Sequence, residues 1–155
     1  MAIEQLDRRE VFQFLRSDQV NTISDAAEVV EYEAGDTIYF KGAKAEHLFV
    51  VLDGQVSLLL PGKAGVSVLI DEATNGTVFG SCVCFDLDTY SLTARCTRDA
   101  RLLKIESVTL KDLMDEDLVM GYTLQTHISR IYFVRYIETM KKLQAIVMNL
   151  PIETA

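Results

Sequence analysis

The middle of the chain consists of short apolar runs that are separated by turn residues at intervals of about 8–12 residues. This pattern extends from Val29 to Ile105, with glycine, proline, asparagine and aspartate at the breaks. Asp53-Gly54 lies between two such runs and predicts a tight hairpin, and Pro61–Gly65 predicts the next connection. Many short strands with frequent turns are typical of an antiparallel barrel or sandwich.

Helical periodicity replaces this pattern at both ends of the chain. Ile3–Ser17 is predicted to form a short amphipathic helix, and a second helical segment is expected at Ser17–Ala27. Beyond the strands glycine and proline nearly vanish, which predicts a short helix at Val108–Met114 and a long one at about Leu118–Asn149. We therefore expect a single domain with N-terminal helices over residues 1–28, a β-barrel over 29–106 and C-terminal helices over 107–150.

One side of the predicted long helix has an apolar seam. Its residues are spaced by 4, 3, 4 and 3 positions and are Tyr136, Met140, Leu143, Val147 and Leu150. Such a seam is suited to pairing with another helix. Part of it is expected to cover the barrel of the same chain, but so long a helix on so small a domain favours a homodimer that forms through this helix.

Composition excludes several classes of protein. The 155 residues are 49% hydrophobic and 25% charged, which is typical of a folded globular domain. The formal net charge of −8 disfavours nucleic acid as a partner. The sequence lacks an apolar run of about 18 residues and a signal-peptide pattern. We therefore expect a cytoplasmic protein without a membrane partner.

Several segments of the barrel region occur in a characteristic order. Ala34–Gly42 contains two glycines that turn the first strands, and Leu48–Val56 follows as a central strand pair. Thr77–Gly80 leads into a turn, and Thr93–Cys96 and Leu102–Ile105 supply the last strands. In order and spacing these segments resemble the effector domain of the catabolite-activator and cyclic-nucleotide-binding superfamily. The resemblance implies a mainly β fold with flanking helices, in which a double-stranded β-helix (jelly-roll) barrel precedes a long C-terminal helix.

The residues that grip the ligand in that family are replaced here. In the family, a Phe-Gly-Glu turn provides a carboxylate to the ribose, and an arginine about nine residues later binds the cyclic phosphate. This chain has Ser81 in place of the glutamate, Tyr90 in place of the arginine, and Leu92 at a position that is usually alanine. A tyrosine offers neither a cation nor a bidentate fork. We therefore expect cyclic nucleotides to bind weakly or not at all.

The long helix is expected to cover this degenerate phosphate-binding cassette. Its aromatic cluster Tyr132, Phe133 and Tyr136 would either stack on a planar ligand or fill the nucleotide's space. Arg135 is the candidate replacement cation, so a cyclic nucleotide or another small anion is the expected ligand class, and no cofactor is assigned. The candidate ligand contacts are Phe79, Gly80, Ser81, Cys82, Tyr90, Ser91, Leu92, Thr93, Tyr132, Arg135 and Tyr136.

Other chemistry is poorly supported by the sequence. Cys82, Cys84 and Cys96 lack a fourth cysteine ligand, so they are interpreted as small buried residues and not as a metal site. His127 is a candidate haem ligand, although a lone helical histidine is more often a surface or interface residue. The acidic groups around Asp71, Asp86, Asp88 and Asp115–Asp117 are interpreted as solvated turns and a helix start. No pattern typical of a catalytic site is present.

These observations predict a non-catalytic sensory or regulatory module that forms a dimer and passes its signal to a separate effector protein. Relatives that regulate transcription have a helix-turn-helix after the long helix, whereas this sequence ends at Ala155. We therefore expect either a regulator that has no DNA-binding domain of its own and works through a partner, or a longer regulator of which these 155 residues are a part. The alternatives are a purely structural interaction dimer with a collapsed pocket, and a haem or redox sensor.

Overall fold

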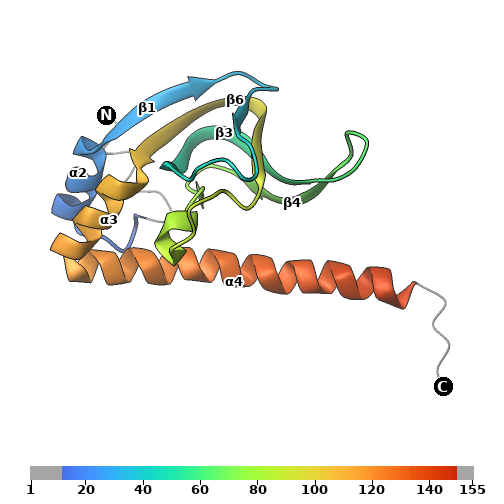
Figure 1. Cartoon of the computed structure of the whole chain (residues 1–155). Helices are drawn as coiled ribbons and strands as arrows, with labels where there is room; N and C mark the ends of the chain where they lie inside the picture. The colour runs from blue at the N-terminus through green and yellow to red at the C-terminus, as the bar shows by residue number, and fades with distance from the viewer. Residues whose placement is uncertain (1–11, 150–155) are drawn as a thin grey trace.

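The computed structural model describes residues 12–149 and contains one antiparallel sheet of six strands that curls into a barrel (Figure 1). The strands are β1 (Ala27–Tyr32), β2 (Thr37–Tyr39), β3 (His47–Pro61), β4 (Ser67–Ala73), β5 (Val78–Phe79) and β6 (Thr93–Glu106). The order is β1-β6-β3-β4, with β2 paired to β6 and β5 paired to β3. The mainly β, jelly-roll fold predicted from the sequence is thus confirmed.

Two long strands form the centre of the sheet, and they correct one prediction. β3 continues through Asp53-Gly54, where a hairpin was expected, and stays paired with β6 from His47 to Leu59. The register shifts between Val51 and Val56, so both strands bend together through bulges. Gly54 has a φ of +112°, and a Cβ there would lie 2.5 Å from the carbonyl oxygen of Asp99. Gly54 is therefore needed for a corner within the paired strands. The connection from β3 to β4 is made instead by the predicted turn that begins at Pro61.

The helices match their predicted positions closely. They are α2 (Ser17–Asp25), α3 (Ser107–Glu116) and α4 (Leu118–Met148), and the helix predicted at residues 3–17 lies largely outside the described residues. Asp117 begins α4, where its carboxylate accepts hydrogen bonds from the Met120 amide at 3.1 Å and from the Gln19 side chain at 3.0 Å. These bonds lower the pKa of Asp117, the Met120 amide having the larger effect.

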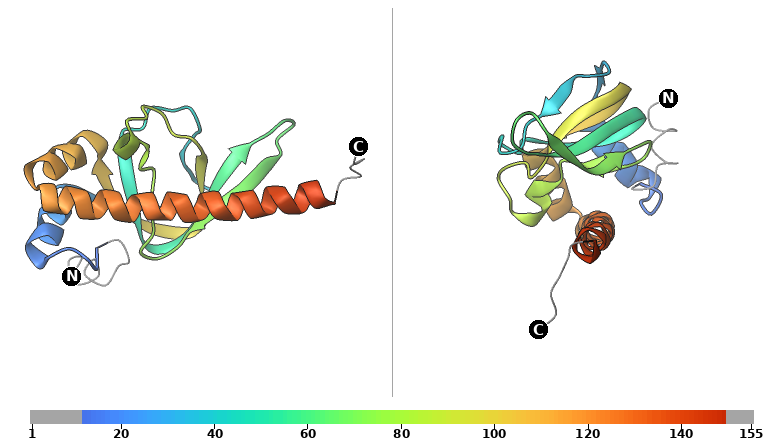
Figure 2. Two further views of the ribbon diagram at one scale, coloured as in Figure 1. Left: turned by 90° about the horizontal axis from the view of Figure 1, so that it is seen from below. Right: turned by 90° about the vertical axis from the view of Figure 1, so that its right-hand side faces the viewer.

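Apolar side chains form two adjoining cores. One joins the barrel to the helices and includes Ile23 of α2, Leu110 of α3, and Leu124 and Ile128 of α4. The other fills the barrel and contains the four aromatic residues Tyr39, Phe49, Phe79 and Tyr90. Figures 1 and 2 show α2 and α3 at one end of the barrel, with α4 running along it.

The second half of α4 runs alongside the β3–β4 hairpin, and its last turns extend beyond that hairpin (Figures 1 and 2). Every residue from Tyr136 to Asn149 is exposed, including four of the five seam residues; the fifth, Leu150, lies outside the described residues. A helical segment of this length gains little stability in water without packing contacts. Among the described residues, no helix combines the length and the apolar character needed to cross a bilayer.

Candidate functional site

The degenerate cassette lies between the barrel and α4. Strand β5 ends at Phe79, Gly80 forms a left-handed turn with a φ of +75°, and a short 3-10 helix, η1 (Cys82–Phe85), follows Ser81. A Cβ at Gly80 would lie 3.2 Å from the carbonyl oxygen of His47 and 3.3 Å from Cε1 of Tyr90. This turn therefore requires glycine both for its backbone conformation and for the close approach of the Tyr90 ring.

Tyr90 fills the barrel next to this turn. Its side chain is buried, with only 5% of the residue exposed, and its ring stacks on Tyr39 with 3.6 Å between centroids. The hydroxyl donates to the carbonyl oxygen of His47 at 2.7 Å and accepts from the His47 amide at 3.1 Å. Burial raises the pKa of Tyr90, so the phenol is neutral at physiological pH. The residue at the arginine's position thus has all its hydrogen bonds within the protein.

The second replaced residue, Ser81, bonds to the long helix. Ser81 is fully buried, and its Oγ donates to the hydroxyl of Tyr132 in α4 at 2.9 Å. The Tyr132 ring also packs edge-on against Phe85 of η1. A second contact joins the Gln125 side chain to the carbonyl oxygen of Cys84 at 2.8 Å. These contacts fasten the cassette to α4.

Arg135 is engaged by two other side chains. Its Nε lies 2.9 Å from a carboxylate oxygen of Asp71 in β4, and its guanidinium carbon lies 4.8 Å from the centroid of the Tyr132 ring. A guanidinium stacked on a ring and paired with a carboxylate is already satisfied electrostatically. In this structure Arg135 fastens α4 to β4 over the cassette.

Comparison with known proteins identifies the family. The sequence profile described as the cyclic nucleotide-binding domain matches residues 29–117, which is more than half of the chain. This chain belongs to the cyclic-nucleotide-binding domain family. The resemblance described above places Phe79-Gly80 at this family's cassette turn, and Ser81 and Tyr90 at the positions of its two charged ligand contacts.

Solved structures with the same fold have low sequence identity to this chain. A Geobacter metallireducens protein described as a cyclic nucleotide-binding protein aligns with a TM-score of 0.76, 22% identity, and coverage of 88% of this chain and 98% of its own. The c-di-GMP-responsive global regulator CLP of Xanthomonas campestris aligns with a TM-score of 0.72, 17% identity, and coverage of 87% and 66%. At these identities the two structures establish the fold.

A curated relative of this family member is the lysophospholipase nte1 of Emericella nidulans, which is 27% identical over 103 residues. The match covers 66% of this chain but only 7% of the relative. The similarity is therefore confined to a small part of a much longer protein.

The structure brings most predicted site residues together but leaves Tyr136 exposed and apart from them. Thr93 is buried and accepts a hydrogen bond from the Lys41 amide, Leu92 packs on the barrel core, and Cys82 Sγ lies 3.9 Å from the Ser91 hydroxyl. The predicted aromatic cluster on α4 is divided, however. Phe133 and Tyr136 are exposed and stack on each other, and only Tyr132 reaches the cassette. Phe133 follows Tyr132 directly and therefore points to a different side of the helix, whereas Tyr136 lies one turn farther along α4.

Two site residues were missed by the sequence interpretation. Tyr39 stacks on Tyr90 inside the barrel, although the alternation of Thr37-Ile38-Tyr39 was compatible with an inward tyrosine. Asp71 was interpreted as part of a solvated turn, but it lies in β4 and pairs with Arg135. No local pattern connects these last two residues, because they lie 64 positions apart.

The cysteines and His127 were the other candidates for chemistry. All three cysteines are free, and burial raises the pKa of Cys84 and of Cys96 to about 11, so both remain weakly nucleophilic thiols. His127 packs edge-on against Phe14 at 4.7 Å, in the wall of a cavity of about 410 Å³ that contains no second histidine and no cysteine in the described part. Across residues 12–149, no group of three or more potential ligands is arranged to hold a metal ion.

Proposed function

We propose that this chain is a regulatory module of the cyclic-nucleotide-binding domain family that works without a cyclic nucleotide. The observation that supports this proposal is Tyr90, which fills the barrel beside the cassette turn and satisfies its hydroxyl on His47. The phenol takes the position of the family's phosphate-binding arginine. The pocket is collapsed onto the protein's own side chains.

A nucleotide would have to displace this side chain. Removing a large aromatic ring from a core typically costs about 3–5 kcal/mol. That cost alone weakens binding by roughly two to nearly four orders of magnitude. Arg135, the candidate replacement cation, is already paired with Asp71 and would not be free for the arriving phosphate. The cost of displacing Tyr90 and the pairing of Arg135 with Asp71 both act against binding. In addition, Ser81 offers the ribose no charge-assisted contact.

The output of the module is proposed to be dimerisation and contact with a separate effector protein. The exposed seam Tyr136, Met140, Leu143 and Val147 provides a face for a second α4. The bonds from Ser81 and Asp71 to α4 fix the orientation of that helix relative to the barrel. A dimer built on such a helix would present its two barrels in a constant arrangement without needing a ligand.

Thermal unfolding tests the absence of ligand binding. A ligand that binds only the folded state and is present at 100 times its Kd stabilises that state by about 2.7 kcal/mol. For a chain of this length the shift in Tm would be roughly 5–11 °C. We expect millimolar cyclic AMP, cyclic GMP and cyclic di-GMP to leave the Tm unchanged. A shift of several degrees with any of them would refute the proposal.

A further inference from the structure

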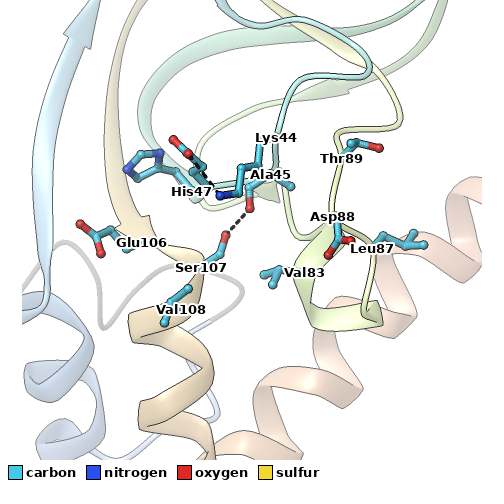
Figure 3. Close-up of a pocket in the computed structure, with 11 residues that line it drawn as sticks. Lys44, Ala45, His47, Val83, Leu87, Asp88, Thr89, Glu106, Ser107 and Val108 are labelled. Carbon is cyan, nitrogen blue, oxygen red and sulfur yellow. Dashed lines mark hydrogen bonds and ion pairs between the residues drawn. The ribbon is translucent and has the colours of Figure 1, made fainter.

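A second cavity, of about 780 Å³, lies on the outer side of the cassette (Figure 3). Three segments that are distant in sequence form its wall: the end of the β2–β3 loop with the first residue of β3, η1 with the loop that follows it, and the junction of β6 with α3. This volume is in the range of natural binding pockets.

Hydrogen bonds between the three segments hold the cavity in shape. The Ser107 amide donates to the carbonyl oxygen of Glu46 at 2.8 Å, and the Ser107 hydroxyl donates to the carbonyl oxygen of Ala45 at 2.9 Å. The Ala45 amide donates to the carbonyl oxygen of Asp88 at 2.8 Å. Tyr90 holds His47 from inside the barrel. The cavity is thus preformed, and its wall is supported by the side chain that replaces the ligand contact.

Apolar side chains are exposed inside this cavity. Val108, in the first turn of α3, is 69% exposed, and Leu87, in the loop after η1, is 53% exposed. Both line the cavity, together with Val83. Exposed apolar side chains within a polar rim are typical of a protein interaction site.

The rim of the cavity is acidic. Its charged side chains are one lysine, Lys44, and three carboxylates, Glu46, Asp88 and Glu106. Lys44 lies 3.9 Å from Glu46, whereas Asp88 and Glu106 form no ion pair among the described residues. Burial, with a smaller contribution from Lys104, lowers the pKa of His47, so its imidazole is neutral near pH 7 and does not offset these carboxylates.

We propose that this cavity docks a basic amphipathic segment of the effector protein. An apolar side chain of that segment would lie against Val108 and Leu87, and its lysine or arginine residues would face Asp88 and Glu106. The proposal rests on the proposed function, in which a separate effector receives the signal. Charge complementarity selects this partner, since a second copy of this chain has a net charge of −8 and a nucleotide is an anion.

A residue-resolved titration tests the site. The probe is a synthetic 14-residue amphipathic peptide of leucine and lysine, added to the ¹⁵N-labelled full chain. Shift changes are expected to cluster at residues 44–47, 87–89 and 106–108. The same peptide with glutamate in place of lysine is expected not to bind. Raising the salt concentration should weaken the lysine peptide, because exposed charges are screened.

Matched variants separate the rim from the general acidity of the chain. Asp88→Asn with Glu106→Gln should raise the Kd by roughly 2- to 30-fold, the range expected for losing two exposed ion pairs. Asp53→Asn with Glu31→Gln makes the same change in net charge on exposed residues that do not line the cavity, and should leave the Kd unchanged.

A second pair of variants tests the apolar contact. Val108→Ser should weaken binding, whereas Val119→Ser, at the equivalent position of α4 and 65% exposed, should not. Shift changes that map to the α4 seam, equal binding of the glutamate peptide, or equal losses in the control variants would overturn this inference. Cyclic-nucleotide binding would instead refute the proposed function and leave the peptide map unchanged.

Discussion

Removing the hydroxyl of Tyr90 is the most specific perturbation of the filled barrel. Tyr90→Phe keeps the ring stacked on Tyr39 but deletes the group that both donates to and accepts from the backbone of His47. Each hydrogen bond contributes about 0.5–1.5 kcal/mol net. We therefore expect the free energy of unfolding to fall by about 1–3 kcal/mol. For a chain of this length the Tm should fall by roughly 2–12 °C.

Urea unfolding followed by circular dichroism measures this loss directly, and the matched control is Tyr122→Phe. Tyr122 lies in α4 and is 76% exposed, so its substitution should change stability by less than about 0.5 kcal/mol. If Tyr90→Phe is as stable as the control variant, the hydroxyl is not held as described. The interpretation of Tyr90 as an internal replacement for a ligand would then be wrong.

Three further perturbations test the contacts of α4. In sedimentation, Leu143→Glu should give a folded monomer, whereas Ala145→Glu, on the opposite side of the predicted seam, should remain a dimer. A wild type that is already monomeric at micromolar concentration would refute the dimer. Tyr132→Phe should cost about 1–3 kcal/mol, since it leaves the buried Ser81 hydroxyl without its partner, and adding Ser81→Ala should recover part of that loss in urea unfolding. Ser81→Glu with Tyr90→Arg should give calorimetrically measurable binding of cyclic AMP only when Tyr132→Ala makes room for the carboxylate; binding by the double variant alone would contradict the tight Ser81–Tyr132 contact.

The fold could be predicted because its signals are local and occur in order. Turn residues and apolar runs located the strands, and the long stretch poor in glycine and proline located α4 almost to the residue. The bend at Asp53-Gly54 could not be distinguished from a hairpin, because both use the same two residues. Only pairing with β6 keeps this segment within one strand.

The site could be predicted in part. The resemblance to the family placed Ser81 and Tyr90 at the positions of the two charged ligand contacts. What replaces these contacts depends on residues that only the fold brings together: His47 with Tyr90, and Tyr132 with Ser81. Tyr132 contacts the cassette, whereas Tyr136, one turn farther along α4, is exposed. The sequence pattern does not reveal where along α4 the contact with the barrel ends.

Isothermal titration calorimetry of cyclic AMP with the wild-type chain tests the central claim most directly. At protein concentrations near 100 µM, the filled barrel predicts no heat above that of dilution. A sub-micromolar Kd, about −8 kcal/mol or more favourable, would contradict it. Such affinity would mean that Tyr90 leaves the barrel and that another group, with Arg135 as the nearest candidate, binds the phosphate.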